Sequence, residues 1–569
     1  MGARTSHGRE QGFHHVAAKF SWLLVGVALI TILPLTSGAS VSALTASATL
    51  PTLHWYVLDG TATWSQTLDP ALATDERSIG PIDLIGAGLV KLLPNGHVIP
   101  DLATWRISKN RRVYWFTLRH NARFNNGDQV TAQDAVFSLT RALAKSTNSP
   151  VAPLYLGHIL GATRLNTGKT NRLQGVRALN SRTVQITLDK PIAFFLETLS
   201  YNTDIVLDAR IMAGKPPQTY LTNTCTANVG AGPFMYVCRN GTGQLTSFYP
   251  PGHTPTMTLV PNPYYYGPKP HIRIVASAIA DDGVNYRDYQ ANGVDVTHVP
   301  LDDVPANSHL SGFHQLPVPS VDFILPNLTA APFSNVHCRL ALAYATDRAT
   351  IGNKVLRHAL LPIYSIVPRG FVGYYAGNDN PHYNPASAQA ELKQCPGGIH
   401  HVQLVYWRLS ADSDSEFSAL QYIWSKLGID VTLRGLPTNP WLNVYTKPLS
   451  KTGTPLFQGV WSADYPDPED FFRTLLYSGA GYNPGQYSNP TYDRLVDQAD
   501  VTVNAAKRAQ LYIRAEHLAI SQGALITLGQ EVSYALVKPY VHGLVAAPFL
   551  YPTIAPRGNN WANVSISPH

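Results

Sequence analysis

The densest group of side chains that could do chemistry lies in the segment W-S-A-D-Y-P-D-P-E-D, residues 461–470, which carries the carboxylates Asp464, Asp467, Glu469 and Asp470. A pair of carboxyl groups about 5 to 9.5 Å apart can hydrolyse a glycosidic bond. A single carboxylate in a dry cleft can instead bind an ammonium group through a charge-assisted hydrogen bond. Spacing along a loop does not fix the distance between carboxyls, so both chemistries stay open. A purely structural interpretation is also available, in which Asp467 and Asp470 cap a helix beginning near Pro468 and Asp464 turns the chain.

Other patterns for catalysis or cofactor binding are missing from the sequence. It contains neither H-E-x-x-H nor G-x-S-x-G. Gly168-Lys169-Thr170 is similar to the end of a phosphate-binding loop, but Thr163 stands where the leading glycine belongs. The adjacent His400 and His401 follow a turn, and two adjacent histidines are typical of a solvated loop rather than a metal site. We therefore predict no cofactor, no bound metal and no catalytic residue.

The elements around the 464–470 carboxylates indicate a parallel α/β sheet. Val402–Trp407 reads as an apolar strand, and the apolar spacing of Phe417, Leu420, Trp424 and Leu427 predicts a helix that ends at Gly428. Another strand begins at Val431, which completes a strand-helix-strand unit with a right-handed crossover. The strand Leu456–Trp461 leads directly into the carboxylate segment. Because ligands of open α/β sheets sit beyond the carboxyl ends of strands, this loop is a natural site.

A separate α+β module is predicted for residues 80–200. Val113–Leu118 and Thr183–Leu188 read as strands, and a helix opens at Thr131 with Asp134 at capping-box spacing. The region from 201 to about 318 is broken by turns. Further along the chain, the pattern predicts helices over 335–348 and 504–521 and an apolar strand near Leu525–Leu528.

Composition excludes several classes of protein. Charged residues make up only 14% of the chain, against roughly 25% in ordinary soluble domains, while hydrophobic residues reach 45%. This rules out a disordered chain and supplies a large core. The net charge of +7 is spread over 569 residues without a block of Lys and Arg. We therefore expect no nucleic-acid partner.

The N-terminus has the layout of a secretory signal: polar residues 1–19, an apolar run Phe20–Leu35 and small residues up to Ala43. The alternative is an uncleaved anchor through residues 20–35, and either one places the body outside the cytoplasm. In that oxidising space Cys225, Cys238, Cys338 and Cys395 permit two disulfides in three connectivities. Pairing of Cys225 with Cys238 is preferred.

Short blocks along the whole mature chain, taken in order, resemble the peptide-binding family of extracytoplasmic solute-binding proteins of ABC importers (family 5, the oligopeptide- and dipeptide-binding type). Each block is weak alone, and their order and spacing carry the resemblance. The blocks are Leu68-Asp69-Pro70, Leu93 through Trp105, Phe116-Thr117-Leu118-Arg119, Phe124-Asn125-Asn126-Gly127-Asp128, Thr131 through Val136, Gly230-Ala231-Gly232-Pro233-Phe234, Asn262-Pro263-Tyr264-Tyr265, Pro332-Phe333 with Arg339 through Arg348, Trp461 through Tyr465, and Tyr487 through Asp493.

The resemblance implies an α/β, two-lobed periplasmic-binding-protein-like fold (type II) with two hinge strands and an inserted α+β subdomain. After a signal or anchor at 1–43, residues 49–79, 201–318 and 535–569 would form a discontinuous lobe I. The inserted subdomain would be 80–200, and lobe II would be 319–534.

The resemblance also implies a function and a site. The protein would be a monomeric, non-enzymatic binding component that captures peptides between its lobes and delivers them to the permease of an ABC importer. Asp464 would hold the α-ammonium group of the ligand, and Trp461 and Tyr465 of the same block would line that pocket. The peptide would add to exposed backbone as an extra strand, and hinge closure would couple binding to docking.

Departures from the family pattern keep other readings open. Ala231 replaces the usual threonine, Ser462 stands where some relatives have a disulfide cysteine, and no lipobox cysteine follows the signal. No residue can be assigned to a ligand carboxylate. A non-peptide ligand on the same fold (nickel chelate, haem or sugar) is one alternative, and a secreted hydrolase that uses the 464–470 carboxylates is another.

Overall fold

The computed structural model describes residues 50–58, 67–74, 76–215, 229–237, 256–279, 282–376, 380–545 and 560–569. The predicted signal and both Cys225 and Cys238 lie outside these residues. Ser47–His569 form one compact unit. Within the described residues, no helix has the length and apolar character needed to cross a membrane.

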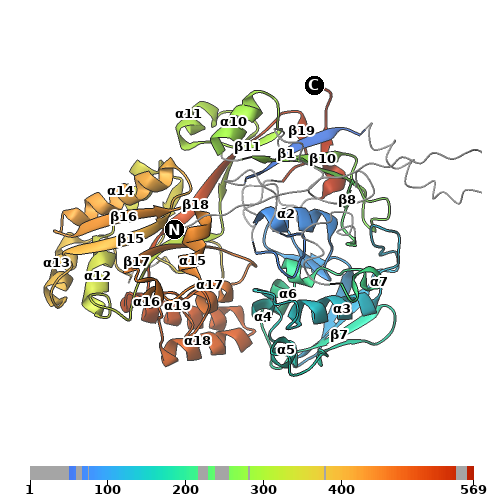
Figure 1. Ribbon diagram of the computed structural model, residues 1–569, viewed down its shortest axis with the longest axis horizontal. Helices are drawn as coiled ribbons and strands as arrows, with labels where there is room; N and C mark the ends of the chain where they lie inside the picture. The colour runs from blue at the N-terminus through green and yellow to red at the C-terminus, as the bar shows by residue number, and fades with distance from the viewer. Residues whose placement is uncertain are drawn as a thin grey trace, which may run out of the picture. The chain divides into compact units, whose positions relative to one another are not determined.

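One lobe is built on a mixed four-stranded sheet. Its order is β1-β10-β9-β8, with β1 parallel to β10 and the other pairs antiparallel. The strands are β1 (Thr52–Leu58), β8 (Phe234–Tyr236), β9 (Thr256–Pro261) and β10 (Arg273–Ile279). Alternating residues of these strands are buried, including Leu53, Phe234 and Ile274. The helix α2 (Glu76–Ile85) contacts β8 and contributes Ile82 and Ile85 to the same core (Figure 1).

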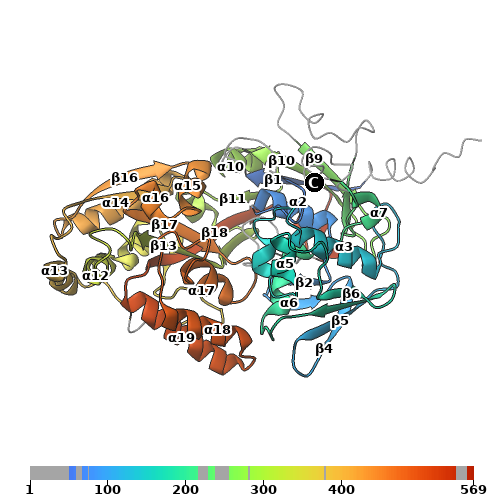
Figure 2. The same ribbon diagram turned by 60° about the horizontal axis from the view of Figure 1, so that its bottom comes forward.

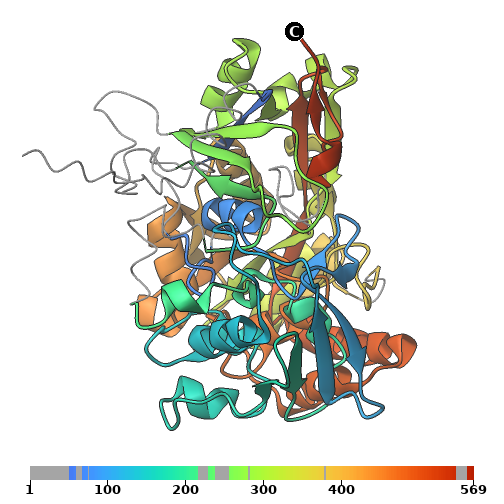
Figure 3. The ribbon, with the colours of Figure 1, turned by 90° about the vertical axis from the view of Figure 1, so that its right-hand side faces the viewer.

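A second, antiparallel sheet carries the order β4-β5-β7-β6. Its strands are β4 (Ala103–Ile107), β5 (Val113–Leu118), β6 (Val176–Ala178) and β7 (Thr183–Thr187). The helix α3 (Ala132–Leu143) covers it, and the predicted capping box between Thr131 and Asp134 is present. The short helices α4 (Ala152–Tyr155), α5 (Ala162–Asn166) and α6 (Phe195–Thr198) complete this region. Figure 3 views it from the side, with the strands next to the cyan helices.

The other lobe is built on an eight-stranded sheet with the path β11-β18-β13-β17-β15-β16, and β12 and β14 also pair with β18. The predicted strand-helix-strand unit is confirmed: β15 (His401–Trp407) runs parallel to β16 (Asp430–Leu436), and α14 (Ala411–Ser425) connects them. On one face the sheet packs on α12 (Val336–Ala345) and α14 (Figure 2). The helices α15 (Thr438–Tyr445), α17 (Glu469–Leu476), α18 (Pro490–Val501) and α19 (Ala505–Ser521) contribute to the core on its other face.

The strand β18 (Ile526–Val537) is much longer than the apolar stretch 525–528 that we predicted. The prediction stopped at Leu528 because Gly529, Gln530 and Glu531 break the apolar run. In the fold these polar positions keep pairing, since β18 meets β13 (Ser320–Pro326) at its start and β11 (Val296–His298) and β12 (Phe313–Pro317) towards its end. The predicted domain boundaries, one of which divides this strand at 534 and 535, stay a prediction.

Three of the sequence blocks meet at one buried junction. The backbone N–H of Asn125 donates to the carbonyl of Gly230 at 2.8 Å. The Asn262 side chain donates to Asn125 Oδ1 at 2.7 Å and to the carbonyl of Gly232 at 2.8 Å. A Cβ on Gly232 would lie 2.6 Å from the Leu84 carbonyl oxygen, so a larger residue does not fit there. These contacts therefore hold the three blocks together in the folded chain.

Cys338, on α12, forms a disulfide with Cys395, which ends α13 (Pro385–Gln394). This is the second bond of the connectivity that pairs Cys225 with Cys238. Cys225 and Cys238 lie outside the described residues, so their pairing stays a prediction. The observed disulfide ties together two helices that also pack closely on each other.

Candidate functional site

The candidate site lies at the C-terminal end of β17 (Leu456–Ser462), a strand of the eight-stranded sheet. Along its whole length β17 pairs with β13 on one side. On the other side it pairs with β15 only at Leu456 and Phe457. Among the described residues no strand pairs with that edge from Gly459 to Ser462. The Val460 carbonyl on this edge already accepts the Tyr445 hydroxyl at 3.3 Å, so an extended ligand that adds as a further strand would share or displace that contact.

The loop after β17 is held by Asp470, the second residue of α17. Asp470 is fully buried, and its Oδ2 accepts the Trp461 indole N–H at 3.2 Å and the Asp464 backbone N–H at 2.8 Å. The expectation that Asp470 caps its helix is therefore wrong, because its side chain turns back to the strand. Asp467 precedes Pro468, the N-cap residue of α17, and its Oδ1 accepts the Glu469 backbone N–H at 2.9 Å, so it satisfies one donor of the first turn without being the cap residue.

The Asp464 side chain is partly exposed and accepts a hydrogen bond from the hydroxyl of Tyr155, the last residue of α4. Burial raises the pKa of the Asp464 carboxyl to about 6. No Lys, Arg or His side chain of the described chain pairs with it. Asp464 is thus mainly anionic above pH 6, and among the described residues its side chain is hydrogen-bonded only by a neutral hydroxyl.

Tyr155 is a site residue that sequence reasoning missed. It lies 309 positions from Asp464 in the chain, and no local pattern marks it. Its ring centroid is 4.5 Å from that of Tyr201 and 5.5 Å from that of Tyr465. Only the packing of the β4–β7 region against the loop after β17 brings these aromatic groups to the carboxylate.

Tyr465, predicted to line the ligand pocket, is 2% exposed and packs into the core of the β4–β7 region. Its ring stacks on Phe194 at 6.2 Å, and its hydroxyl donates to Glu469. The backbone N–H of Ala193 donates to the Asp500 carbonyl at 2.8 Å in the same interface. A ligand contact by Tyr465 stays a prediction, while its contact across this interface is direct.

Trp461, the third predicted residue, is half-buried and belongs to a chain of aromatic side chains. Its ring lies 4.9 Å from Tyr482, which lies 5.4 Å from Tyr445. Tyr445 continues to Trp441 at 5.0 Å, and Trp441 to Trp407 at 5.0 Å. Tyr445 and Trp441 are buried in the core, so only the partly exposed rings of Trp461, Tyr482 and Trp407 can supply an aromatic wall near this edge of β17.

The remaining carboxylates of the segment are neutralised by arginines. Arg508 of α19 binds Asp467 through both terminal nitrogens, with one contact at 2.5 Å. Arg473 of α17 pairs with Glu469 at 3.0 Å, with Asp497 at 2.7 Å and with Asp500 at 2.5 Å. Asp467 is thereby fixed in a buried ion pair, which is unsuited to the acid-base cycling that a hydrolase needs.

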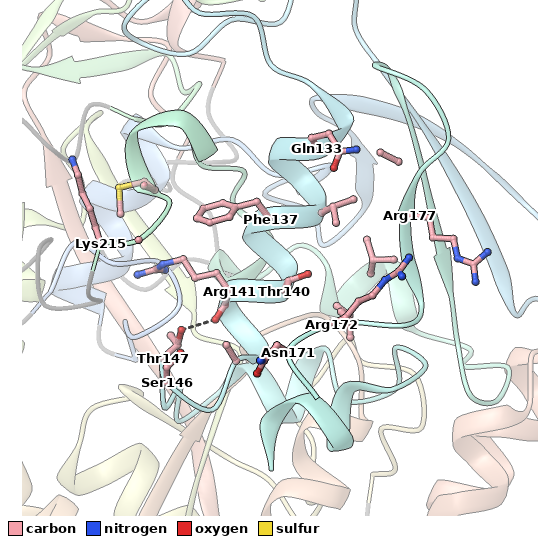
Figure 4. A pocket seen from close by; sticks show the side chains of 17 residues that line it. Gln133, Phe137, Thr140, Arg141, Ser146, Thr147, Asn171, Arg172, Arg177 and Lys215 are labelled. Atoms are coloured by element: carbon pink, nitrogen blue, oxygen red, sulfur yellow. Dashed lines mark hydrogen bonds between the residues drawn. The ribbon is translucent and has the colours of Figure 1, made fainter. Parts of the chain in front are cut away.

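Among the described residues, this site holds no metal cluster, and the hollow described below lies apart from it. In the ranges that the structure describes, no group of three His, Cys, Asp or Glu side chains could hold a metal ion. A hollow of about 1070 Å³ lies between α3 and the loops around Arg172 and Lys215 (Figure 4). Its lining residues all fall between 133 and 215 and include none of the residues around Asp464.

Comparison with known proteins gives a consistent result. Residues 97–483 match the family model described as bacterial extracellular solute-binding proteins, family 5 Middle. The oligopeptide-binding protein OppA of Bacillus subtilis is 28% identical, over 80% of this chain and 84% of its own. The probable deoxycholate-binding protein YgiS of Escherichia coli is also 28% identical, over 84% and 88%. The crystal structure of Haemophilus influenzae OppA in complex with RPPGFSPFR superposes with a TM-score of 0.74 at 20% identity, covering 91% of this chain and 99% of that one.

Proposed function

The chain belongs to family 5 of the bacterial extracellular solute-binding proteins, and from this premise we propose that it captures peptides between its two lobes and hands them to the permease of an ABC importer. The observation that carries the proposal is the position of Asp464. This carboxylate lacks a basic partner in the described structure and stands at the end of a strand edge with which no described strand pairs from Gly459 to Ser462.

Peptide capture follows from these two features together. The α-ammonium group of a peptide would bind Asp464 through charge-assisted hydrogen bonds, each worth about 1.5 to 3 kcal/mol when water is excluded. The peptide backbone would then run back along Gly459–Ser462, antiparallel to β17. Main-chain hydrogen bonds do not depend on sequence, so this mode tolerates many peptides. The aromatic wall that begins at Trp461 would take apolar side chains.

Tyr155 extends the proposal to lobe closure. Its hydroxyl reaches Asp464 from α4, whereas Asp464 belongs to the loop after β17. A ligand held at Asp464 would therefore be contacted by both parts of the molecule. Closure around it would remove water and create the surface that the permease recognises.

The remaining parts of the proposal concern location and assembly. Export would depend on residues 1–43, with cleavage after Ala43 or retention through the apolar run 20–35. The protein would act as a monomer and without catalysis. Burial of Asp467 in its ion pair with Arg508 supports binding over hydrolysis.

Isothermal titration calorimetry tests the proposal with a pentapeptide whose side chains carry no charge. Wild-type protein should bind the peptide with a free N-terminus at least tenfold more tightly than its N-acetylated form, because acetylation removes the ammonium charge. The Asp464→Asn variant should lose this preference. Asp430→Asn is the matched control, since Asp430 begins β16 at the opposite edge of the parallel strands and is largely exposed. Equal affinity for both peptides in the wild type would refute the role of Asp464.

A further inference from the structure

The hollow beside α3 is formed by one part of the chain, because all of its lining residues fall between 133 and 215. Its volume of about 1070 Å³ is comparable with that of pockets that enclose a small molecule, roughly 300 to 1,000 Å³. Neither the 461–470 segment nor β17, both of which the structure describes in full, lines it. A molecule bound there would be a second ligand, so this inference does not depend on the proposed function.

One face of α3 forms the floor of the hollow. Gln133, Phe137 and Thr140 line it and follow one another at intervals of three or four residues, which places them on the same face of the helix. A different face, which includes Leu139, is buried in the core of the β4–β7 region. Phe137 and Thr140 are only partly buried. The floor therefore keeps apolar surface that a ligand could cover.

The segments that flank this helix face add further apolar side chains to the lining. Leu173 precedes β6 and Val176 begins it, and both are buried. Met212, at the end of α7 (Ala209–Met212), is buried as well. Together with Phe137 these residues give the hollow an apolar interior, as is usual in pockets for small molecules. Because burial of apolar surface favours binding, we expect an occupant with an apolar body.

The charged side chains of the described lining are all basic: Arg141, Arg172, Arg177 and Lys215 line the hollow, and no Asp or Glu does. Arg141 is already neutralised by Asp69, whose Oδ1 accepts its Nη1 at 2.9 Å. The other three are exposed and form no ion pair with an Asp or Glu of the described chain. Figure 4 shows Arg172 and Arg177 on one side of α3 and Lys215 on the other. The hollow should therefore attract an anion and repel a cation.

We propose that this hollow is a second binding site, for a free anionic amphiphile, which is a small molecule with an acidic head and an apolar body. The head would bind Arg172 and Arg177 through charge-assisted hydrogen bonds, which are stronger than those between neutral groups. The body would lie across Phe137 and displace water from the apolar interior. Exposed arginines or a partly exposed ring alone are ordinary features of a protein surface. Their combination in one hollow selects a molecule that has both properties.

Isothermal titration calorimetry with three soluble probes tests both properties. Decanoate carries an acidic head and an apolar chain, acetate carries only the head, and decyltrimethylammonium carries a chain of similar length with the opposite charge. Each is used below the concentration at which it forms micelles. Decanoate should bind roughly tenfold more tightly than decyltrimethylammonium, because only its head can bond the arginines. It should bind roughly a hundredfold more tightly than acetate, because its chain removes apolar surface from water.

A double variant attributes the binding to the hollow. Arg172→Gln with Arg177→Gln should weaken decanoate binding roughly tenfold and leave the affinity for the neutral pentapeptide unchanged. Arg164→Gln with Lys169→Gln is the matched control, since both residues are exposed in the same part of the chain and do not line the hollow. It removes the same charge and should bind decanoate as the wild type does. All four side chains are exposed, so we expect both double variants to fold, which circular dichroism checks.

The inference is overturned if decanoate binds no better than the cationic probe, if the Arg172 and Arg177 double variant binds it as the wild type does, or if the matched control loses as much affinity. Sedimentation with phosphatidylglycerol vesicles adds a further test, since binding to vesicles without binding of free decanoate would place a membrane surface there instead. Decanoate binding that only the first double variant weakens supports the site. Failure of pentapeptide binding beside that result would refute the proposed function and leave the second site standing.

Discussion

Two acidic regions of this molecule differ in how their charge is balanced. In the 464–470 segment, Asp467 and Glu469 are paired with Arg508 and Arg473. In the group of Asp322 on β13, Glu416 on α14 and Glu531 on β18 the first two are buried and Glu531 is partly exposed, and none of the three has an arginine, lysine or histidine partner among the described residues. The arginines of the first region hold the loop through buried ion pairs, whereas the carboxyls of the second lack a basic partner in the described chain and their pKa values are raised by burial. Asp464 belongs to the first segment but resembles the second group, because among the described residues a tyrosine hydroxyl is the only side chain that bonds it.

The largest expected effect on stability comes from removing an arginine from the buried ion pairs of the 464–470 segment. Arg508→Ala would leave Asp467 buried without its partner, so we expect a loss of about 3 to 5 kcal/mol in the free energy of unfolding. Urea denaturation measures it. Arg357→Ala, which removes an exposed pair with Asp302, should cost at most about 1 kcal/mol. Similar losses in both variants would contradict the distinction between buried and exposed pairs.

The second prediction concerns the pH dependence of ligand binding at Asp464. The pKa of this carboxyl is raised to about 6 in the absence of ligand. Protonation below that pH removes the charge that holds an ammonium group. Affinity for a free N-terminus should therefore fall roughly tenfold from pH 7 to pH 5.

Calorimetry at several pH values measures this change. The Asp464→Asn variant, which cannot titrate at this position, provides the control and should show a flat profile over the same range. A wild-type affinity that does not change between pH 7 and pH 5 would show that the ammonium group is held elsewhere.

The third prediction compares two similar substitutions that should change the stability of the protein in opposite directions. Asp467→Asn should destabilise the ligand-free protein, because it leaves Arg508 without its anionic partner. Glu416→Gln should stabilise it by roughly 1 kcal/mol at pH 8, because it removes an unpartnered carboxylate. The pKa of Glu416 is raised by folding, so its contribution to stability is fully present below its unfolded pKa and is lost as the pH rises.

Thermal unfolding of both variants and the wild type between pH 4 and pH 8 shows whether each substitution raises or lowers the stability. The gain from Glu416→Gln should accordingly disappear towards pH 4, where the wild-type side chain is protonated in both states. Destabilisation by Glu416→Gln at pH 8 would mean that this carboxyl has a partner that stabilises its charge.

The smallest expected effect is that of Tyr155→Phe. This change removes one hydroxyl that donates to Asp464 and keeps the ring that packs on Tyr201 and Tyr465. A single hydrogen bond to a charged group corresponds to about 1.5 to 3 kcal/mol at most. Because a ligand ammonium group can replace the hydroxyl as donor, we expect less than a tenfold change in peptide affinity by calorimetry. A larger loss would place the hydroxyl itself in contact with the ligand.

The sequence by itself determined the local elements and the family blocks. Capping by Thr131 and Asp134, the parallel pairing of β15 with β16 and the strand that leads to Asp464 all follow from periodicity and turn residues over short stretches. These features depend on neighbours within about twenty residues, so a single sequence contains them. The order of the blocks likewise identified the family before any contact was known.

Only the tertiary structure decided which side chains meet. Tyr155 reaches Asp464 across 309 positions, Arg508 reaches Asp467 across 41, and Asp470 turns back to Trp461 instead of capping its helix. The polar residues of β18 ended its predicted strand too early, yet one of them, Glu531, lies with Asp322 and Glu416. Long-range charge balance depends on the packing of whole elements against one another, and local sequence patterns carry no record of that packing.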